Sequence, residues 1–381
     1  MHDFNVRQLK QEASFHPIEG GAVVYHAGAQ RIFALNTTAA LVWLDIRDGN
    51  TPEQAAQHLV DRFDLDEAEA ARWVQLALAS FGSEGLSGHK ADTFDIPAAI
   101  TSAATSLSTG IDYRVLDHTV RIDAPDSAAP WIDSLLGNLR QGDADSRAAP
   151  DLAIAIRPAS DGYDVTAANE TVTAVNAINL AAAVEKSIVE NIVPLVPHFM
   201  AFHAALLKKG TQAVLFPAPS GSGKTTLTAR LAARGWEYGS DEMAFFDRIL
   251  RWRGLPFPPC IKAESYPMVR SWHGGLDDAR EHQRFGRRIK FLPLASTASR
   301  EEVRMVVFPR YEPTARSALE PMPPLDGLAK LLGQCIYVPP GLDSEDVRRL
   351  IQWHDHAAYF DMNYRDLDAV VDILDERLSS S

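Results

Sequence analysis

One stretch in the middle of the chain limits the possible folds more than any other. Residues 214–216 are Val-Leu-Phe, an apolar and β-prone run, and residues 217–223 are all Pro, Ala, Ser or Gly. The loop ends in Gly-Lys-Thr and opens a helix over residues 227–234, which stops at Gly235, and another apolar run lies within 236–246. Strand, loop, helix and strand in this order are typical of α/β proteins. We therefore predict an α/β domain built around the loop.

The loop has the composition of a phosphate-binding P-loop. Residues 218–226 read A-P-S-G-S-G-K-T-T, which is G-x-x-x-x-G-K-[ST] with Ala218 at the first glycine. Small residues let successive N–H groups face phosphate oxygens, and the helix N-terminus adds its dipole. Lys224 would reach the β- and γ-phosphates, and the Thr225 hydroxyl would ligate Mg²⁺. The predicted phosphate-binding residues are Pro219, Ser220, Gly221, Ser222, Gly223, Lys224, Thr225 and Thr226.

Two adjacent acids belong to the next predicted strand. Asp241 follows Lys224 by 17 residues, enough for one helix and a return strand, and Glu242 comes directly after it. A carboxylate at this strand end can hold Mg²⁺ or accept the proton of an attacking hydroxyl. The candidate metal ligands are therefore Thr225, Asp241 and Glu242, and spacing alone does not divide the roles between the two acids. An exposed acidic turn is the alternative.

A histidine lies in the apolar run before the loop. His203 precedes Lys224 by 21 residues and is flanked by Phe202 and Ala204. A single histidine in an apolar strand is most often a core residue, so the residues alone do not assign it a catalytic role.

These segments together resemble a known family. Residues 202–205, 218–226 and 240–242 are similar to the catalytic core of HPr kinase/phosphorylase, and more closely to related kinases encoded in peptide-modification clusters. Residues 306–311 are similar to those relatives as well. The resemblance implies a PEP-carboxykinase-like α/β fold, ATP as phosphoryl donor and a protein serine as acceptor. It also implies that His203 and Asp241 are the acid/base pair beside Lys224, whereas Glu242 departs from the family's usual Asp-Asp.

The N-terminal region reads as a separate unit over residues 20–85. Two short strands, 22–26 and 31–35, precede a helix with cap residues at 36–38, a second helix capped by Thr51 and a third helix at 66–81. This winged-helix-like α+β unit resembles the PqqD-type peptide-recognition domain. The resemblance implies that it binds the leader of a ribosomally made precursor peptide by strand addition.

Two other interpretations of the N-terminal unit are a winged-helix DNA reader and a purely structural domain. Residues 1–90 contain 7 Lys+Arg and 12 Asp+Glu, which disfavours DNA. A segment rich in Ser, Thr, Ala and Gly follows, so we predict a peptide-binding domain at 1–90, a linker at 91–107 and the kinase domain at 108–381.

The overall composition excludes several classes of function. The net charge of −13 argues against nucleic-acid and anionic-membrane partners. The sequence has no run of about 18 apolar residues and no secretory signal near its start, so we expect a cytoplasmic protein. The two cysteines, Cys260 and Cys335, do not form a metal-binding motif. The family resemblance implies an oligomer without fixing its size.

Weaker candidates are basic residues downstream of the loop. Lys262 and Arg310 could supply an additional cation for phosphoryl transfer. Arg284, Arg287, Arg288 and Lys290 form a basic cluster that could contact phosphates or an acidic peptide, although a solvated loop is the commoner explanation.

These patterns favour an ATP- and Mg²⁺-dependent serine kinase that phosphorylates a precursor peptide or small protein. Recognition of the leader would rest partly on residues 20–85. The alternatives are a small-molecule kinase, because the loop does not reveal the acceptor, and a nucleotide-gated adaptor that delivers a peptide without catalysis.

Overall fold

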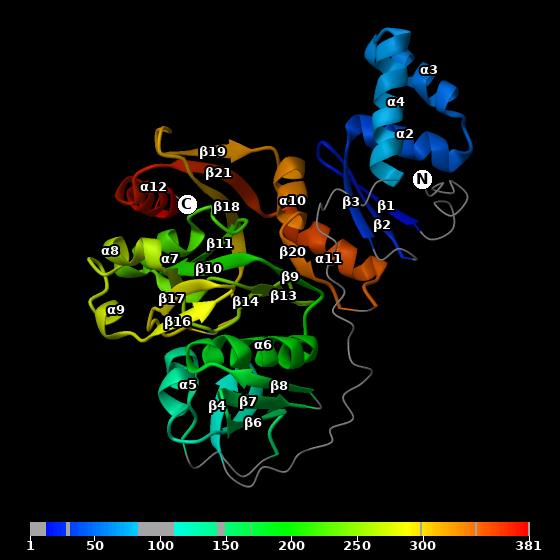
Figure 1. Ribbon diagram of the computed structural model, residues 1–381. Coiled ribbons are helices and arrows are strands. Elements are labelled where there is room, and N and C mark those ends of the chain that lie inside the picture. Colours follow the sequence, from blue (N-terminus) through cyan, green and yellow to red (C-terminus); the bar gives the residue numbers. More distant parts are fainter. Residues whose placement is uncertain are drawn as a thin grey trace.

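The computed structural model describes residues 13–27, 31–82, 110–142, 149–168, 170–297, 299–339 and 341–379. The predicted linker at 91–107 lies outside the described residues. The fold is mixed α/β, as predicted, and has three parts (Figure 1). These are a small N-terminal unit, a five-stranded sheet with two helices, and a larger part that contains the glycine-rich loop.

The N-terminal unit is a three-stranded antiparallel sheet followed by three helices. Its elements are β1 (Ala13–Ile18), β2 (Gly21–His26), β3 (Arg31–Asn36), α2 (Thr37–Asp48), α3 (Pro52–Phe63) and α4 (Glu67–Gly82). The Asn36 side chain caps α2, and Thr51 with Gln54 forms a capping box on α3. The predicted hairpin and three helices are thus confirmed, and β1 is an additional strand.

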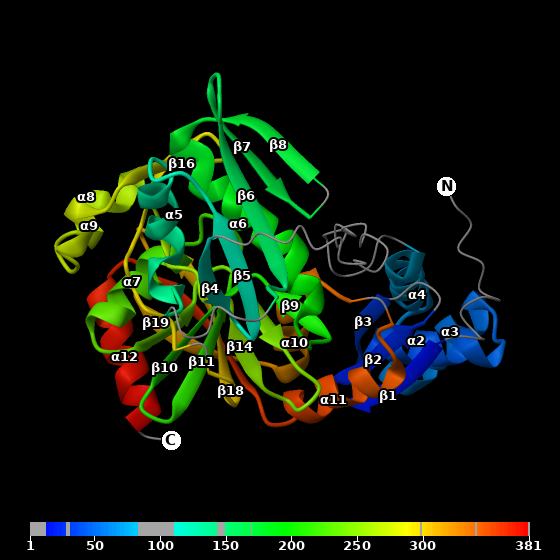
Figure 2. The same cartoon turned by 90° about the horizontal axis from the view of Figure 1, so that it is seen from below.

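Both faces of this small sheet are buried. One face (Ala22, Val24, Phe33 and Leu35) packs on α2, α3 and α4, whereas the other (Val23, Tyr25 and Ala34) packs on α10 (Pro324–Leu332) and α11 (Ser344–His354). The Tyr25 hydroxyl donates a hydrogen bond to the Leu342 carbonyl. Both views show the N-terminal unit beside these two helices (Figures 1 and 2). The N-terminal unit therefore shares a core with the C-terminal part.

The second part is a five-stranded sheet with strands in chain order. It contains β4 (Ile111–Val115), β5 (His118–Asp123), β6 (Leu152–Ala159), β7 (Gly162–Ala167) and β8 (Glu170–Val175), with α5 (Ala129–Leu136) and α6 (Leu180–Ile192). Only β5 and β6 are parallel among these described pairs. Leu180, Ala181, Val184 and Ile188 of α6 form a buried stripe at helical spacing.

A six-stranded mixed sheet forms the centre of the third part. Its order is β12 (Glu237–Ser240), β10 (Ala204–Lys209), β11 (Gln212–Pro217), β18 (Val303–Tyr311), β21 (Ala358–Tyr364) and β19 (Ala318–Met322). One face packs on α7 (Lys224–Ala233) and α12 (Leu367–Ser379). The opposite face packs on α10 and α11 and shares its core with the N-terminal sheet. Alternate residues of each strand enter these two cores.

Two smaller sheets complete the third part. One has the order β14 (Trp252–Gly254), β13 (Ala244–Phe246), β9 (Met200–Phe202) and β20 (Cys335–Tyr337), and the other β15 (Cys260–Lys262), β17 (Arg287–Phe291) and β16 (Glu281–Arg284). The short helices α8 (Tyr266–Val269) and α9 (Gly275–Asp278) lie between β15 and β16 in the chain. In the described part of the chain, none of the helices has the length and apolar character needed to span a bilayer.

Candidate functional site

The glycine-rich loop connects β11 to α7, as predicted. Ala218, which replaces the first glycine of the motif, is 2% exposed and keeps an ordinary backbone conformation. Its methyl group is therefore accommodated in the core below the loop. Gly221 and Gly223 adopt left-handed φ values of 91° and 90°, so both positions need glycine's freedom.

Two tyrosines from neighbouring strands hold the loop in place. The Tyr311 N–H donates to the Ser222 carbonyl at 3.0 Å. A Cβ added at Gly223 would lie 2.3 Å from the hydroxyl oxygen of Tyr364. Glycine is therefore required at position 223 for two reasons, the left-handed φ angle and the close approach of β21.

Lys224 and Asp241 form a buried pair beneath the loop. The Lys224 side chain is 6% exposed, and its Nζ lies 3.5 Å from Oδ1 of Asp241 and also donates to the Asp241 carbonyl. The Thr228 hydroxyl donates to the same Oδ1 at 3.2 Å, whereas Oδ2 is buried without a hydrogen-bond partner among the described residues. Burial raises the pKa of Asp241, and the nearby Lys224 opposes this effect. Oδ2 of Asp241 is thus a buried acceptor that the described residues leave without a donor.

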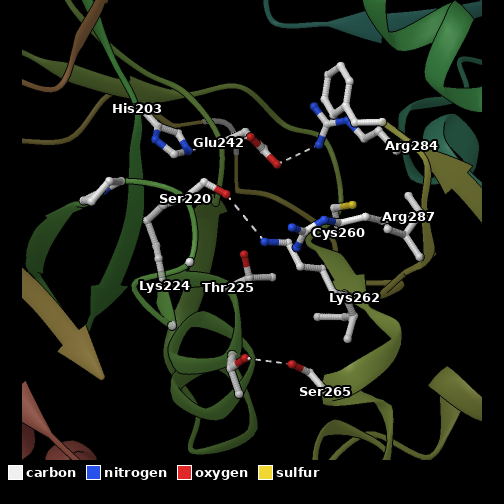
Figure 3. A pocket seen from close by; sticks show the side chains of 17 residues that line it. His203, Ser220, Lys224, Thr225, Glu242, Cys260, Lys262, Ser265, Arg284 and Arg287 are labelled. Atoms are coloured by element: carbon white, nitrogen blue, oxygen red, sulfur yellow. Dashed lines mark hydrogen bonds and ion pairs between the residues drawn. The ribbon is translucent and has the colours of Figure 1, made fainter. Parts of the chain in front are cut away.

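Glu242 points the opposite way, into a pocket of about 390 Å³ that the loop also lines (Figure 3). Its Oε2 lies 3.9 Å from Nε2 of His203, and its Oε1 accepts a hydrogen bond of 2.8 Å from Arg284. The predicted pairing of His203 with Asp241 is therefore corrected, because Glu242 is the acid beside His203. The two acids follow directly after β12, where successive side chains turn to opposite sides.

Burial and neighbouring charges set the protonation states of His203 and Glu242. Burial, together with Lys224, lowers the pKa of His203 to about 4, so the imidazole is neutral at neutral pH. Burial alone would raise the pKa of Glu242, but Arg284 and Lys224 outweigh it and hold the pKa below its ordinary value. A neutral imidazole and an ionised carboxylate thus lie side by side, and each can accept a proton.

The two predicted extra cations, Lys262 and Arg310, lie in different places. Lys262 lines the pocket, with its Nζ 3.5 Å from the Ser220 hydroxyl. Arg310 is largely exposed and lies 3.8 Å from Glu312, in a different surface depression. Only Lys262 is therefore positioned to contact a ligand on the loop.

The four residues of the predicted basic cluster also have different surroundings. Arg284 and Arg287 line the pocket, whereas Arg288 pairs with Glu281 at 2.7 Å and Lys290 donates to the carbonyl of Leu276 at 2.8 Å. Half of the predicted cluster is thus structural. All four residues belong to the hairpin of β16 and β17, and its side chains Arg284 and Arg287 form part of one wall of the pocket.

Sequence reasoning missed Glu185, which supports this wall from α6. Its Oε1 lies 2.9 Å from Arg284, and burial raises its pKa to about 7. The signal was present, because position 185 falls on the buried stripe of α6, four residues after Ala181. An acid on such a stripe indicates a buried cationic partner.

A second depression lies at the edge of the N-terminal sheet. Among the described strands β3 pairs only with β2, so its outer edge is free. A groove of about 460 Å³ runs along this edge between α4 and α10. Its lining is largely apolar and comprises Ala34, Leu35, Asn36, Thr38, Ala39, Trp73, Leu76, Ala77, Ser80, Leu325, Asp326 and Ala329.

Comparison with known proteins supports the prediction for the N-terminal unit. The family model of coenzyme PQQ synthesis protein D (PqqD) matches residues 21–86, which cover β2, β3 and the three helices. No curated protein matches the chain. The PqqD match supports an N-terminal peptide-recognition domain. It is consistent with a precursor peptide as partner and with a role in modifying that peptide.

Proposed function

We propose that this protein is an ATP-dependent serine kinase, similar to HPr kinase, that phosphorylates a precursor peptide captured by its N-terminal domain. The observation that carries the proposal is the pocket in which the glycine-rich loop meets the pair of Glu242 and His203. A PEP-carboxykinase-like fold of residues 108–381 is part of the same proposal.

The loop side of the pocket fits the phosphates of ATP. The left-handed Gly221 and Gly223 turn the backbone around the start of α7, and Lys224 is held at that point by Asp241. Thr225 and the unpartnered Oδ2 of Asp241 would hold Mg²⁺. Glu242 is less suited to this role, because Arg284 already occupies one of its oxygens. Bound Mg²⁺ supplies charge neutralisation for the transferring phosphoryl group.

The opposite side of the pocket fits a serine hydroxyl. Its oxygen would attack the γ-phosphorus as the bond to the bridging oxygen of ADP breaks, and the hydroxyl proton would pass to His203 or Glu242. Both groups are unprotonated acceptors at neutral pH. This arrangement favours turnover over the adaptor alternative, since an adaptor needs no proton acceptor facing the loop.

The groove beside β3 supports a peptide acceptor over a small molecule. An extended leader could pair with the free edge of β3, with α4 and α10 on its two sides. Binding there would raise the local concentration of the acceptor serine at the pocket.

The test uses the full-length protein with ATP, Mg²⁺ and a positional-scanning peptide library that carries a fixed central serine. We expect phosphate incorporation. Glu242→Gln should lower turnover about 10²- to 10⁴-fold with little change in ATP affinity. Asp241→Asn, the matched control, should instead weaken the binding of ATP with Mg²⁺. Nucleotide binding without phosphoryl transfer to any peptide would overturn the kinase proposal and favour the adaptor.

A further inference from the structure

The tip of the hairpin that forms one wall of the pocket holds a residue that the fold does not explain. β16 and β17 are joined by Phe285 and Gly286, with φ values of 49° and 73°. Two-residue turns of this kind favour Asn, Asp and Gly, because both central residues are left-handed. Phe285 is nevertheless a bulky aromatic, and it is 91% exposed. It bears the backbone strain of the turn and gains no burial in return.

The ring of Phe285 lies at the rim of the pocket that holds the glycine-rich loop. The guanidinium carbon of Arg284 is 5.3 Å from the ring centroid. Arg284 is itself fixed by Glu185 at 2.9 Å and by Glu242 at 2.8 Å. The exposed ring is therefore attached to a rigid ion-pair network that ends at the proposed proton acceptors.

Position within the pocket indicates which ligand the ring would contact. In Figure 3 Arg284, Glu242 and His203 lie along one side, whereas Thr225 and Ser265 lie toward the start of α7. If Glu242 and His203 accept the proton of the attacking serine, as proposed above, the γ-phosphate of a nucleotide held by the loop faces them and its base lies on the other side. Phe285 follows Arg284 directly and thus belongs to the acceptor side.

We propose that Phe285 is a substrate-specificity residue that binds an apolar or aromatic side chain of the acceptor peptide, one or two residues from the phosphorylated serine. This inference rests on the proposed kinase function. An extended peptide advances about 3.4 Å per residue, so a neighbour of a serine at His203 and Glu242 can reach the rim. Contact would cover the exposed ring and remove apolar surface from water.

The serine-peptide library used above tests this role when the wild type is compared with Phe285→Asn and Phe285→Leu. Asn accepts a left-handed φ and so preserves the turn, whereas Leu preserves an apolar surface. The wild type should prefer apolar residues at one position beside the serine. Phe285→Asn should lower kcat/KM for the preferred peptides roughly 10-fold and remove the preference, with the KM for ATP unchanged. Phe285→Leu should retain most of the preference for apolar residues beside the serine.

The outcomes separate the two proposals. If the wild type phosphorylates no peptide, the kinase proposal fails and this inference fails with it. If peptides are phosphorylated and the apolar preference survives in Phe285→Asn, only the role of Phe285 is overturned. A rise in the KM for ATP with peptide preference intact would mean that the ring stacks on the nucleotide base, which also overturns the inference.

Discussion

The groove beside β3 and the pocket around the glycine-rich loop are built in opposite ways. The groove is mostly apolar, offers a free strand edge, and takes its walls from helices of two different parts of the chain. The pocket is lined mainly by polar and charged residues, and buried or half-buried ion pairs hold its side chains in place. A free backbone edge accepts many sequences, whereas fixed charges act on one chemical group. In the proposed function, partner capture by the groove and chemistry in the pocket are therefore separate tasks.

If the pocket depends on fixed geometry, a single methyl group should damage it. Gly223→Ala places a Cβ 2.3 Å from the Tyr364 hydroxyl and forces a left-handed φ on alanine. We expect ATP affinity to fall about 10- to 100-fold, since such strain costs roughly 1–3 kcal/mol. Calorimetry with ATP and Mg²⁺ measures the loss, and peptide binding at the groove should not change.

The double variant Gly223→Ala/Tyr364→Phe is the matched control. Removing the hydroxyl leaves the Tyr311 Cβ at 3.2 Å and the nearest Tyr364 ring atom at 3.4 Å from the added Cβ, so the severe clash is relieved but a tight contact and the φ strain remain. Partial recovery of ATP affinity is therefore expected. No recovery at all would mean that the backbone angle and the contact with Tyr311, and not the contact with β21, make Gly223 necessary.

The groove should tolerate small changes and respond to charge on either wall. Leu76 of α4 is 60% exposed, and Ala329 lies on the α10 wall. We expect Leu76→Arg and Ala329→Arg each to weaken peptide capture roughly 5- to 30-fold, since a buried contact at the centre of an interface is worth about 1–2 kcal/mol. The KM for ATP should not change. Binding of peptides selected on the full-length wild type measures the effect.

Gln75→Arg is the control, because Gln75 is an exposed neighbour on α4 that does not line the groove. It adds the same charge and should leave capture unchanged. If only the α4 variant loses binding, α10 is a neighbour of the groove and not a wall that the peptide contacts.

The sequence predicted the centre of each region better than its surroundings. Strand β2 is an apolar run without alternation, which is typical of a strand buried on both faces, yet nothing local identifies α10 and α11 as the second cover. The spacing located Asp241 and Glu242 but not their directions, because a change of side at a strand end depends on the following turn. Arg284 and Glu185 meet across a long stretch of chain, and Arg310 misses the pocket because β18 carries it elsewhere.

The smallest expected effect is a difference in how the stability of the two regions depends on pH. His282 of β16 is fully buried against Trp131 and Phe291, and neither ring nitrogen has a hydrogen-bond partner among the described residues. Burial, with a smaller contribution from Arg280, lowers the pKa of His282 from 6.5 to about 4. The unfolded chain therefore takes up a proton first as the pH falls. The stability associated with the neutral ring is present above about pH 6.5 and is lost toward pH 4.

Between pH 7 and pH 5.5 this histidine should lower the free energy of unfolding by about 1 kcal/mol. Urea unfolding of the wild type and of His282→Leu at both pH values measures the contribution of His282 to this loss of stability, because leucine fills a similar volume and does not titrate. The variant should lose correspondingly less stability on acidification. His282 lies in the hairpin that carries Arg284 and Phe285. At pH 5.5 the protection of amides against hydrogen exchange, corrected for the intrinsic exchange rate, should therefore fall in β16 and β17 before it falls in β3 and α4. Equal pH dependence of wild type and variant would show that acid acts elsewhere and that the wall of the pocket is no more sensitive than the groove.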